Sequence, residues 1–363
     1  MIREGLLLFI LAFPLASCGS GPTTPGGDLS GAGDNFGAPA HPPADTLSPG
    51  GTDTLPPPPP PDSGLVPPPP DTATPPPPDT VPPPIDTLGP PPLPPPGAPP
   101  VHVGIPFGLA QAPVEKFGEY SATVYNAHSN PAHFLADLEA ARRANTRLFV
   151  SFTGNEVNLV SGNGFEIEKW KQRTDRFRGV NLQPYIDDGT IIGNYVMDEP
   201  EDKANWDGIR VTPAQVEAVA AYSKSVWPTL PTMVRTPPSY LAGQSFQALD
   251  AARVQYLDRF APADSFIPAN VEGAKRLGLA LVGGLNVLNG GDGSSGIPGR
   301  KEGKWAMGPD EIRRFGRQFL DEPYICAFII FEYDEGYLAR PGIREALAEL
   351  AEIARTREKK ECR

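Results

Sequence analysis

The chain of 363 residues has few side chains that bind transition metals, with only three cysteines and four histidines. A zinc site needs three or four ligands that meet in space. With so few cysteines and histidines, this chain has little to build one from. Cys326 lies in an apolar run and Cys362 is next to the C-terminus, so we expect a buried thiol, no disulfide framework and a fold held by its core. We predict no metal ion and no other cofactor. The histidines all lie early, at His41, His102, His128 and His133.

The chain also lacks an apolar run long enough to span a membrane, which as a helix takes about 20 residues. The apolar run at residues 6–12 has only seven, and Arg3 precedes it. A basic start followed by a short apolar run predicts a signal peptide at residues 1–17.

The signal peptide is followed by Cys18, and Leu15-Ala16-Ser17-Cys18 resembles the bacterial lipobox. The resemblance implies a lipoprotein that carries palmitate or a similar lipid on Cys18 and is anchored outside the cytoplasm, in the cell envelope. Gly19 is not an aspartate, which by the same resemblance implies the outer membrane where the cell has one. An ordinary signal peptide followed by an incidental cysteine is the alternative.

Residues 18–100 are rich in proline and almost lack aromatic residues. Aspartates followed by threonine or serine recur every seven to nine residues between Asp45 and Asp86. Such a segment has no apolar face to bury, so we predict a disordered linker. In the extended proline helix, at about 3.1 Å per residue, it would reach on the order of 200 Å.

Most of the net charge of −12 belongs to this linker, because residues 1–100 contain nine acidic residues and one basic residue. The other 263 residues carry 34 acidic and 30 basic side chains. Nucleic-acid-binding domains are usually basic, so we predict no nucleic-acid partner. We expect a monomer that contacts the membrane through its lipid.

Residues 101–363 have the usual length of a (β/α)8 barrel, an α/β fold of about 250 residues. Apolar strand-like runs alternate with helical stretches, which predicts parallel strands joined by helices. A doubly wound open sheet is the alternative. The eight expected strands are 103–107, 122–125, 147–152, 191–197, 232–235, 254–257, 279–285 and 327–331.

Three of the helices have clear start signals, in which a capping residue precedes a proline at the first helical position. A last helix at residues 343–353 is expected to close the barrel. The three start signals are Asn130-Pro131, Thr212-Pro213 and Gly308-Pro309.

In (β/α)8 barrels the site is built at the C-terminal ends of the strands. Polar residues follow several of the expected strands directly, and carboxylates occur in pairs after the fourth and the eighth. One polar residue after a strand is common, because strands usually lead into polar loops. Polar residues after many of the strands predict a site. Its members are Asn155, Asp198, Glu199, Arg235, Asn286, Glu332 and Asp334.

The run Tyr195-Val196-Met197-Asp198-Glu199-Pro200 resembles the Asn-Glu-Pro motif of the clan A glycoside hydrolases. The resemblance implies a (β/α)8 fold and makes Glu199 the general acid, with Asp198 in place of the family's asparagine. The family's nucleophile ends the seventh strand, where this chain has Asn286 and no acid. Glu332, after the eighth strand, is the best second carboxylate.

Glycoside hydrolysis uses one carboxyl that protonates the leaving oxygen and one that acts as nucleophile or as base toward water. Glu199 and Glu332 are the predicted catalytic pair. Aromatic rings near strand ends can stack on the apolar faces of sugars. Together with the polar strand ends, they give the predicted substrate-binding residues, which are Asp198, Asn155, Tyr125, Arg235, Asn286, Trp305, Tyr333 and Asp334.

The chain has no Gly-x-Ser-x-Gly motif, the sequence around the nucleophilic serine of many hydrolases. The glycine-rich segment 289–296 lacks the following lysine of a phosphate-binding loop and is a flexible loop, a lid or a calcium-binding loop. Two functions remain. One is a membrane-tethered glycoside hydrolase of extracytoplasmic oligo- or polysaccharide, and the other is a barrel that binds glycan or cell-wall material without cleaving it.

Overall fold

The computed structural model describes residues 101–363, so the predicted signal peptide, Cys18 and the linker lie outside the described residues. Eight parallel strands form one sheet in the order β1-β8-β7-β6-β5-β4-β3-β2. The predicted (β/α)8 fold is confirmed. The strands are β1 (Phe107–Leu109), β2 (Ala122–Asn126), β3 (Arg147–Ser151), β4 (Ile191–Asp198), β5 (Thr232–Arg235), β6 (Ala251–Arg253), β7 (Ala280–Gly283) and β8 (Ile325–Ile330).

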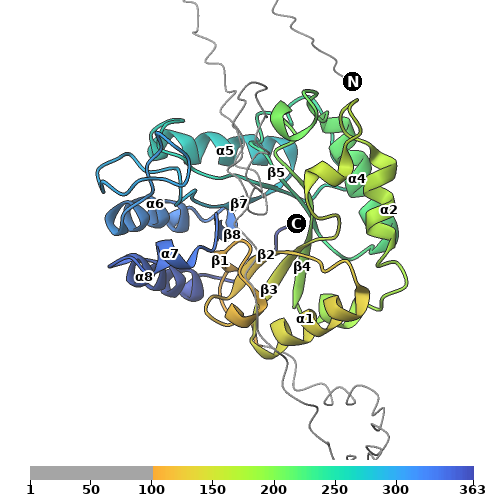
Figure 1. The fold of residues 1–363 in the computed structure, drawn as a ribbon, viewed down its shortest axis with the longest axis horizontal. Coiled ribbons are helices and arrows are strands. Elements are labelled where there is room, and N and C mark those ends of the chain that lie inside the picture. Colours follow the sequence, from red (N-terminus) through yellow and green to blue (C-terminus); the bar gives the residue numbers. More distant parts are fainter. Residues whose placement is uncertain (1–100) are drawn as a thin grey trace, which may run out of the picture.

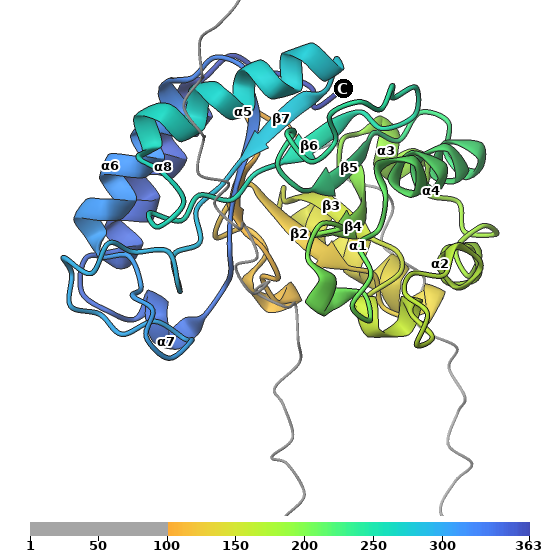
Figure 2. The ribbon, with the colours of Figure 1, turned by 90° about the horizontal axis from the view of Figure 1, so that it is seen from above.

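The helices lie around the outside of the strands, as Figure 1 shows along the barrel and Figure 2 from the side. The α-helices are α1 (Pro131–Arg143), α2 (Ile167–Asp175), α3 (Gln183–Asp187), α4 (Pro213–Val226), α5 (Ala263–Leu277), α6 (Pro309–Asp321), α7 (Glu335–Leu338) and α8 (Ile343–Thr356). Short 3-10 helices follow three of the strands, η1 (Val114–Lys116), η2 (Glu156–Leu159) and η3 (Lys203–Asn205). Within residues 101–363, none of the helices has both the length and the apolar character that a membrane span requires.

The three predicted helix starts are confirmed. Asn130 Oδ1 accepts a hydrogen bond from the Ala132 amide at 2.9 Å, and Thr212 forms a reciprocal capping box with Gln215. Gly308 has no side chain to cap α6, and Glu311 Oε2 instead accepts a hydrogen bond from the Gly308 amide at 2.8 Å. These bonds satisfy amides that a helix start leaves without an intrahelical partner.

The barrel closes where β1 meets β2, through bonds that differ from a regular ladder. Thr123 Oγ1 donates to the Leu109 carbonyl at 2.7 Å, and the Gln111 amide donates to the Val124 carbonyl at 2.8 Å. A Cβ on Gly108 would lie 1.9 Å from the Ala122 carbonyl oxygen, so this close approach requires glycine.

The first described residues run past the loops at the amino ends of the strands. Val101 O accepts a hydrogen bond from Asn145 Nδ2 at 3.2 Å, just before β3. The Ile105 amide donates to the Ala354 carbonyl at 3.1 Å, near the C-terminal end of α8. The chain therefore enters the barrel at the end opposite the carboxyl ends of its strands.

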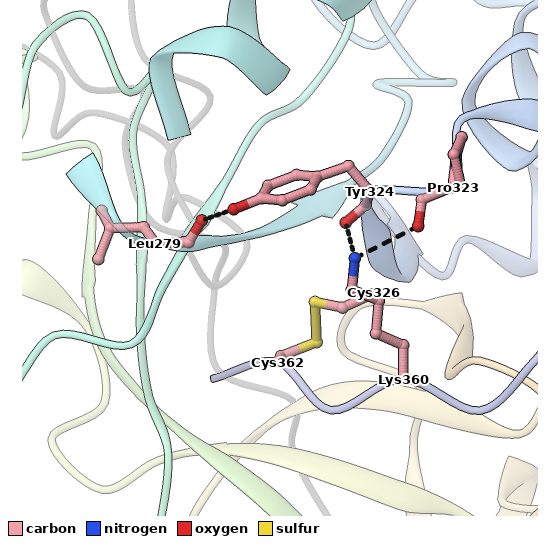
Figure 3. The surroundings of a disulfide bond; sticks show 6 residues. All are labelled: Leu279, Pro323, Tyr324, Cys326, Lys360 and Cys362. Carbon is pink, nitrogen blue, oxygen red and sulfur yellow. Dashed lines mark hydrogen bonds between the residues drawn. A yellow bond between two sulfur atoms is a disulfide. The ribbon is translucent and has the colours of Figure 1, made fainter. Parts of the chain in front are cut away.

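A disulfide joins Cys326 to Cys362, and its Cα atoms are 5.3 Å apart. The expectation of a free buried thiol and of a fold held by its core alone was wrong. After α8 the chain folds back against β8, where Lys360 Nζ donates to the carbonyls of Pro323 at 3.3 Å and Tyr324 at 3.2 Å (Figure 3). This return of the C-terminal segment brings the two sulfur atoms together, although the cysteines are 36 positions apart in the sequence.

Candidate active site

The carboxyl ends of β4 and β5 hold a buried ion pair. Asp198 ends β4 and Arg235 ends β5, and the two residues are neighbours in the sheet register. Arg235 Nη2 donates to Asp198 Oδ2 at 3.1 Å, and Arg235 Nε contacts Oδ1 of the same carboxylate. The side chains are only 4% and 2% exposed, so this pair is almost completely removed from water.

The same guanidinium also holds Glu199, the residue after β4. Arg235 Nη2 lies 2.9 Å from Glu199 Oε2, and Glu199 remains 19% exposed. Glu199 has a left-handed backbone with φ of 38°, which is uncommon for a residue other than glycine. The Glu199 amide donates to the Arg235 carbonyl at 2.9 Å, and Trp206 Nε1 donates to the Glu199 carbonyl at 2.9 Å. Backbone strain of this kind persists where the surroundings enforce it, and it occurs often at functional sites.

Two residues that were not among the predicted site residues complete the network. The Tyr195 hydroxyl donates to Asp198 Oδ1, and Gln255 Oε1 accepts from Arg235 Nη1. Burial alone would lower the pKa of Arg235, but Asp198 and Glu199 together hold it well above its usual value. Arg235 therefore remains a cation that matches two carboxylates at the end of the barrel.

A pocket opens beside this network, at the carboxyl ends of β2, β3 and β4. Asp198 and the predicted Asn155 both line it, together with Trp206 from the loop after β4. Glu156, the first residue of η2, lines it as well. Burial, and then the nearby Asp198 charge, raise the pKa of Glu156 to about 8. Asn155 was predicted from the sequence, but Glu156, the residue after it, was not.

The predicted Glu332 lies in a second cluster after β8. Arg300, from the loop between β7 and α6, contacts Glu332 Oε1 through Nη1 and Asp334 Oδ2 through Nη2, the latter at 3.0 Å. Asp334 Oδ1 also accepts from the Tyr337 amide at 2.8 Å at the start of α7. Burial would raise the pKa of Asp334, but this hydrogen bond and Arg300 lower it. Glu332 and Asp334 are therefore joined by an arginine that the sequence analysis missed.

Four predicted residues have separate surroundings. Tyr125 donates to Asp137 Oδ2 at 2.5 Å and packs in the apolar cluster that includes Phe134 of α1. Asn286 is fully buried and its Oδ1 accepts from the Asn289 amide at 2.9 Å, which shapes the loop after β7. Trp305 is 44% exposed in the same loop, and Tyr333 donates to Glu335 Oε2 at 2.6 Å.

The end of β7 carries no acid, as the sequence indicated. The strand ends at Gly283, and Gly284, Leu285 and Asn286 follow. The eight-strand count therefore leaves Glu332 after β8 and not after β7. Across residues 101–363, no three side chains of histidine, cysteine, aspartate or glutamate come together in a way that could hold a metal ion.

Fold and site together define a (β/α)8 barrel with arginine-paired carboxylates at the carboxyl ends of its strands. No protein-family profile matches the chain, and no curated protein matches its sequence. Solved structures do share the fold. A GH5_18 protein from Bifidobacterium longum subsp. infantis aligns with a TM-score of 0.50 at 10% identity, covering 71% of this chain and 80% of that one.

Two further solved structures align less well. A D-psicose 3-epimerase has a TM-score of 0.39 at 15% identity, over 69% of this chain and 96% of that one. Saccharomyces cerevisiae Gas2p in complex with laminaripentaose has a TM-score of 0.43 at 8% identity, over 68% of this chain and 59% of that one. At 10% identity, the likeness to the Bifidobacterium protein shows the fold alone.

Proposed function

We propose that the barrel acts on glycans and hydrolyses a glycosidic bond of an extracytoplasmic oligo- or polysaccharide. The observation that carries this proposal is the placement of Glu199. It follows β4 in a left-handed backbone, is ion-paired with Arg235, and keeps part of its side chain exposed at the carboxyl end of the barrel. A carboxylate held this firmly at the end of a barrel strand is suited to chemistry on a bound ligand.

Other carboxyl groups follow further strands of the same barrel, and glycoside hydrolysis requires two of them. Glu156 lines the neighbouring pocket, and Glu332 follows β8 in contact with Arg300. Hydrolysis of an acetal needs one acidic group and one basic group, which two carboxyls in different surroundings provide. The partly exposed Trp305 offers an apolar face on which a sugar ring can stack.

Glu199→Gln should lower kcat/KM by about 100-fold or more, because acid or base catalysis by one side chain contributes roughly 100- to 10,000-fold. The purified full-length protein would be assayed on a panel of aryl glycosides and polysaccharides. Glu332→Gln, which removes the other predicted catalytic carboxylate, should also lower activity. Glu168→Gln is the matched control, since Glu168 lies on α2 with a side chain that is 76% exposed. Full activity in Glu199→Gln would show that this carboxyl takes no part.

A barrel that binds glycan without cleaving it is the second candidate function. It is favoured by the end of β7, which offers glycine, leucine and asparagine but no acid. In that case the parent protein would cleave nothing in the panel, and the parent and Glu199→Gln would bind the same polysaccharide equally well in affinity electrophoresis.

The proposal includes export and a lipid anchor on Cys18. The lipobox-like sequence supports it, and so does the disulfide between Cys326 and Cys362, because structural disulfides persist mainly in oxidising compartments outside the cytoplasm. Together these features suit a protein held in the cell envelope, in the outer membrane where the cell has one.

Cys18→Ser should abolish incorporation of radiolabelled palmitate and move the protein from the membrane fraction to the soluble fraction. A single acyl chain binds membranes only weakly, so the release depends on losing every lipid on this residue. Cys362→Ser is the control and should keep the label. Labelling that persists in Cys18→Ser would exclude this anchor.

A further inference from the structure

The pocket beside Asp198 contains a carboxyl to which the proposed reaction has not yet given a role. Glu156 is the first residue of η2, directly after the loop that follows β3. It lines the same pocket as Asp198 and Trp206, and its side chain is half-buried. Glu199 is the next residue along the chain from Asp198, so the pocket and the proposed catalytic residue share one strand end.

The two carboxyls predicted from the sequence are poorly suited to donate a proton. Glu199 is ion-paired with Arg235, and Glu332 is ion-paired with Arg300. A cation beside a carboxyl favours its ionised form. The reaction nevertheless needs a protonated group, because the oxygen of an ordinary sugar alcohol is a poor leaving group without a proton.

We propose that Glu156 is the catalytic acid of this barrel and that Glu199 is the base, for substrates whose leaving group is a sugar or another alkyl alcohol. This assignment rests on the proposed glycoside hydrolase function. It transfers the acid role from Glu199, where the sequence resemblance put it, to the wall of the neighbouring pocket.

The charges around Glu156 support the protonated form. Burial and Asp198 of β4 raise the pKa of Glu156 to about 8, while Arg235 of β5 lowers it less strongly. Arg173 of α2 donates from Nε to the Thr153 carbonyl, and it is not among the groups that shift the pKa of Glu156. Below about pH 8 most molecules therefore carry a proton on Glu156.

Glu201 is the other carboxyl near this strand end whose pKa is raised, again mainly by burial. Its Oε2 accepts a hydrogen bond from Thr236 Oγ1 at 2.7 Å, which favours the ionised form. The pocket is lined by Glu156 and not by Glu201. Glu156 is therefore the better placed donor.

The reaction balances with water as the only other reactant. Glu156 transfers its proton to the glycosidic oxygen as the bond from this oxygen to the anomeric carbon breaks, and the leaving group departs as an alcohol. Glu199 takes a proton from water, whose oxygen bonds to the anomeric carbon. Glu156 is left ionised and Glu199 protonated, and exchange with solvent restores both.

Leaving-group dependence tests the assignment in the full-length protein. Glu156→Gln should lower kcat/KM at least about 100-fold on alkyl glycosides and oligosaccharides. It should stay within a few-fold of the parent on dinitrophenyl glycosides, whose phenolate leaves without a proton. Glu199→Gln should lose activity on both substrate classes, and Glu168→Gln on neither. In the parent, activity on alkyl glycosides should fall as the pH rises through about 8, and activity on dinitrophenyl glycosides should not.

A second measurement verifies that Glu156→Gln is folded. Burial of a carboxyl with a raised pKa destabilises the native state increasingly as the pH rises from the unfolded pKa of about 4.3 toward 8. Glutamine never ionises, so the melting temperature of Glu156→Gln relative to the parent should increase over that range. The carbonyl stretch of a protonated acid, seen by infrared spectroscopy in the parent at neutral pH, should be absent from the variant.

The outcomes separate this inference from the function on which it rests. A parent protein that cleaves nothing overturns both. An active parent whose Glu156→Gln variant loses activity equally on both substrate classes, or on neither, overturns only the role of Glu156. An active parent without the infrared band of a protonated Glu156 also overturns that role.

Discussion

Arg235→Gln should lower the free energy of unfolding by about 3–5 kcal/mol, the range found when one partner of a buried ion pair is removed. Arg235 is matched with Asp198 and Glu199, and the Asp198 side chain is only 2% exposed. Without the Arg235 guanidinium, the Asp198 carboxylate would be buried without the cation that pairs with it. Urea unfolding of the parent and the variant, followed by tryptophan fluorescence, measures the difference.

Two further variants separate the buried charge from a general effect of losing an arginine. Arg178→Gln removes an ion pair with Asp175 whose side chains are 52% and 41% exposed, and it should change stability by less than about 1 kcal/mol. Adding Asp198→Asn to Arg235→Gln removes the unmatched charge and should recover part of the lost stability. Equal stability of Arg235→Gln and the parent would mean that the network contributes nothing to the fold.

Cys362→Ser should lower the free energy of unfolding by about 4 kcal/mol, the entropy that closing a loop of 36 residues removes from the unfolded chain. The disulfide fixes the segment after α8 to β8, where Cys326 is completely buried and Cys362 is 7% exposed. Unfolding of the oxidised and reduced parent, beside the variant, measures this contribution.

Reduction supplies the control for this second prediction. The reduced parent and Cys362→Ser should have nearly the same stability, and a reductant should not change the variant further. If the reduced and oxidised parent unfold at the same urea concentration, the cross-link does not stabilise the barrel.

The sequence was most informative where local chemistry decides the structure. The strand at Thr232–Arg235 and the cap at Thr212 were predicted with the bounds that the structure shows. β6 was expected at residues 254–257 but lies at Ala251–Arg253. The prediction missed it because Arg253, although fully buried, is a charged residue that interrupts the apolar pattern of the strand. β1 was expected at 103–107, but those residues mainly lead into the strand at Phe107–Leu109.

Contacts between distant segments were beyond the sequence pattern. Strand ends placed Asp198, Glu199 and Arg235 near one another, but only the folded register shows one guanidinium reaching both carboxylates. Arg300 comes from a long loop whose path has no periodic signal, and Cys326 meets Cys362 through the return of the C-terminal segment. Such pairs depend on tertiary packing, which neither propensity nor spacing encodes.

The first described residues lie beside Asn145 and Ala354. Val101 and Ile105 lie at the amino ends of the strands, whereas Glu199 lies at a carboxyl end. If the preceding residues lead to a lipid on Cys18, the linker joins the barrel at the amino ends of its strands and leaves the opposite end uncovered. A linker of on the order of 200 Å would then let the proposed site reach polymers far from the bilayer without being blocked by its own attachment.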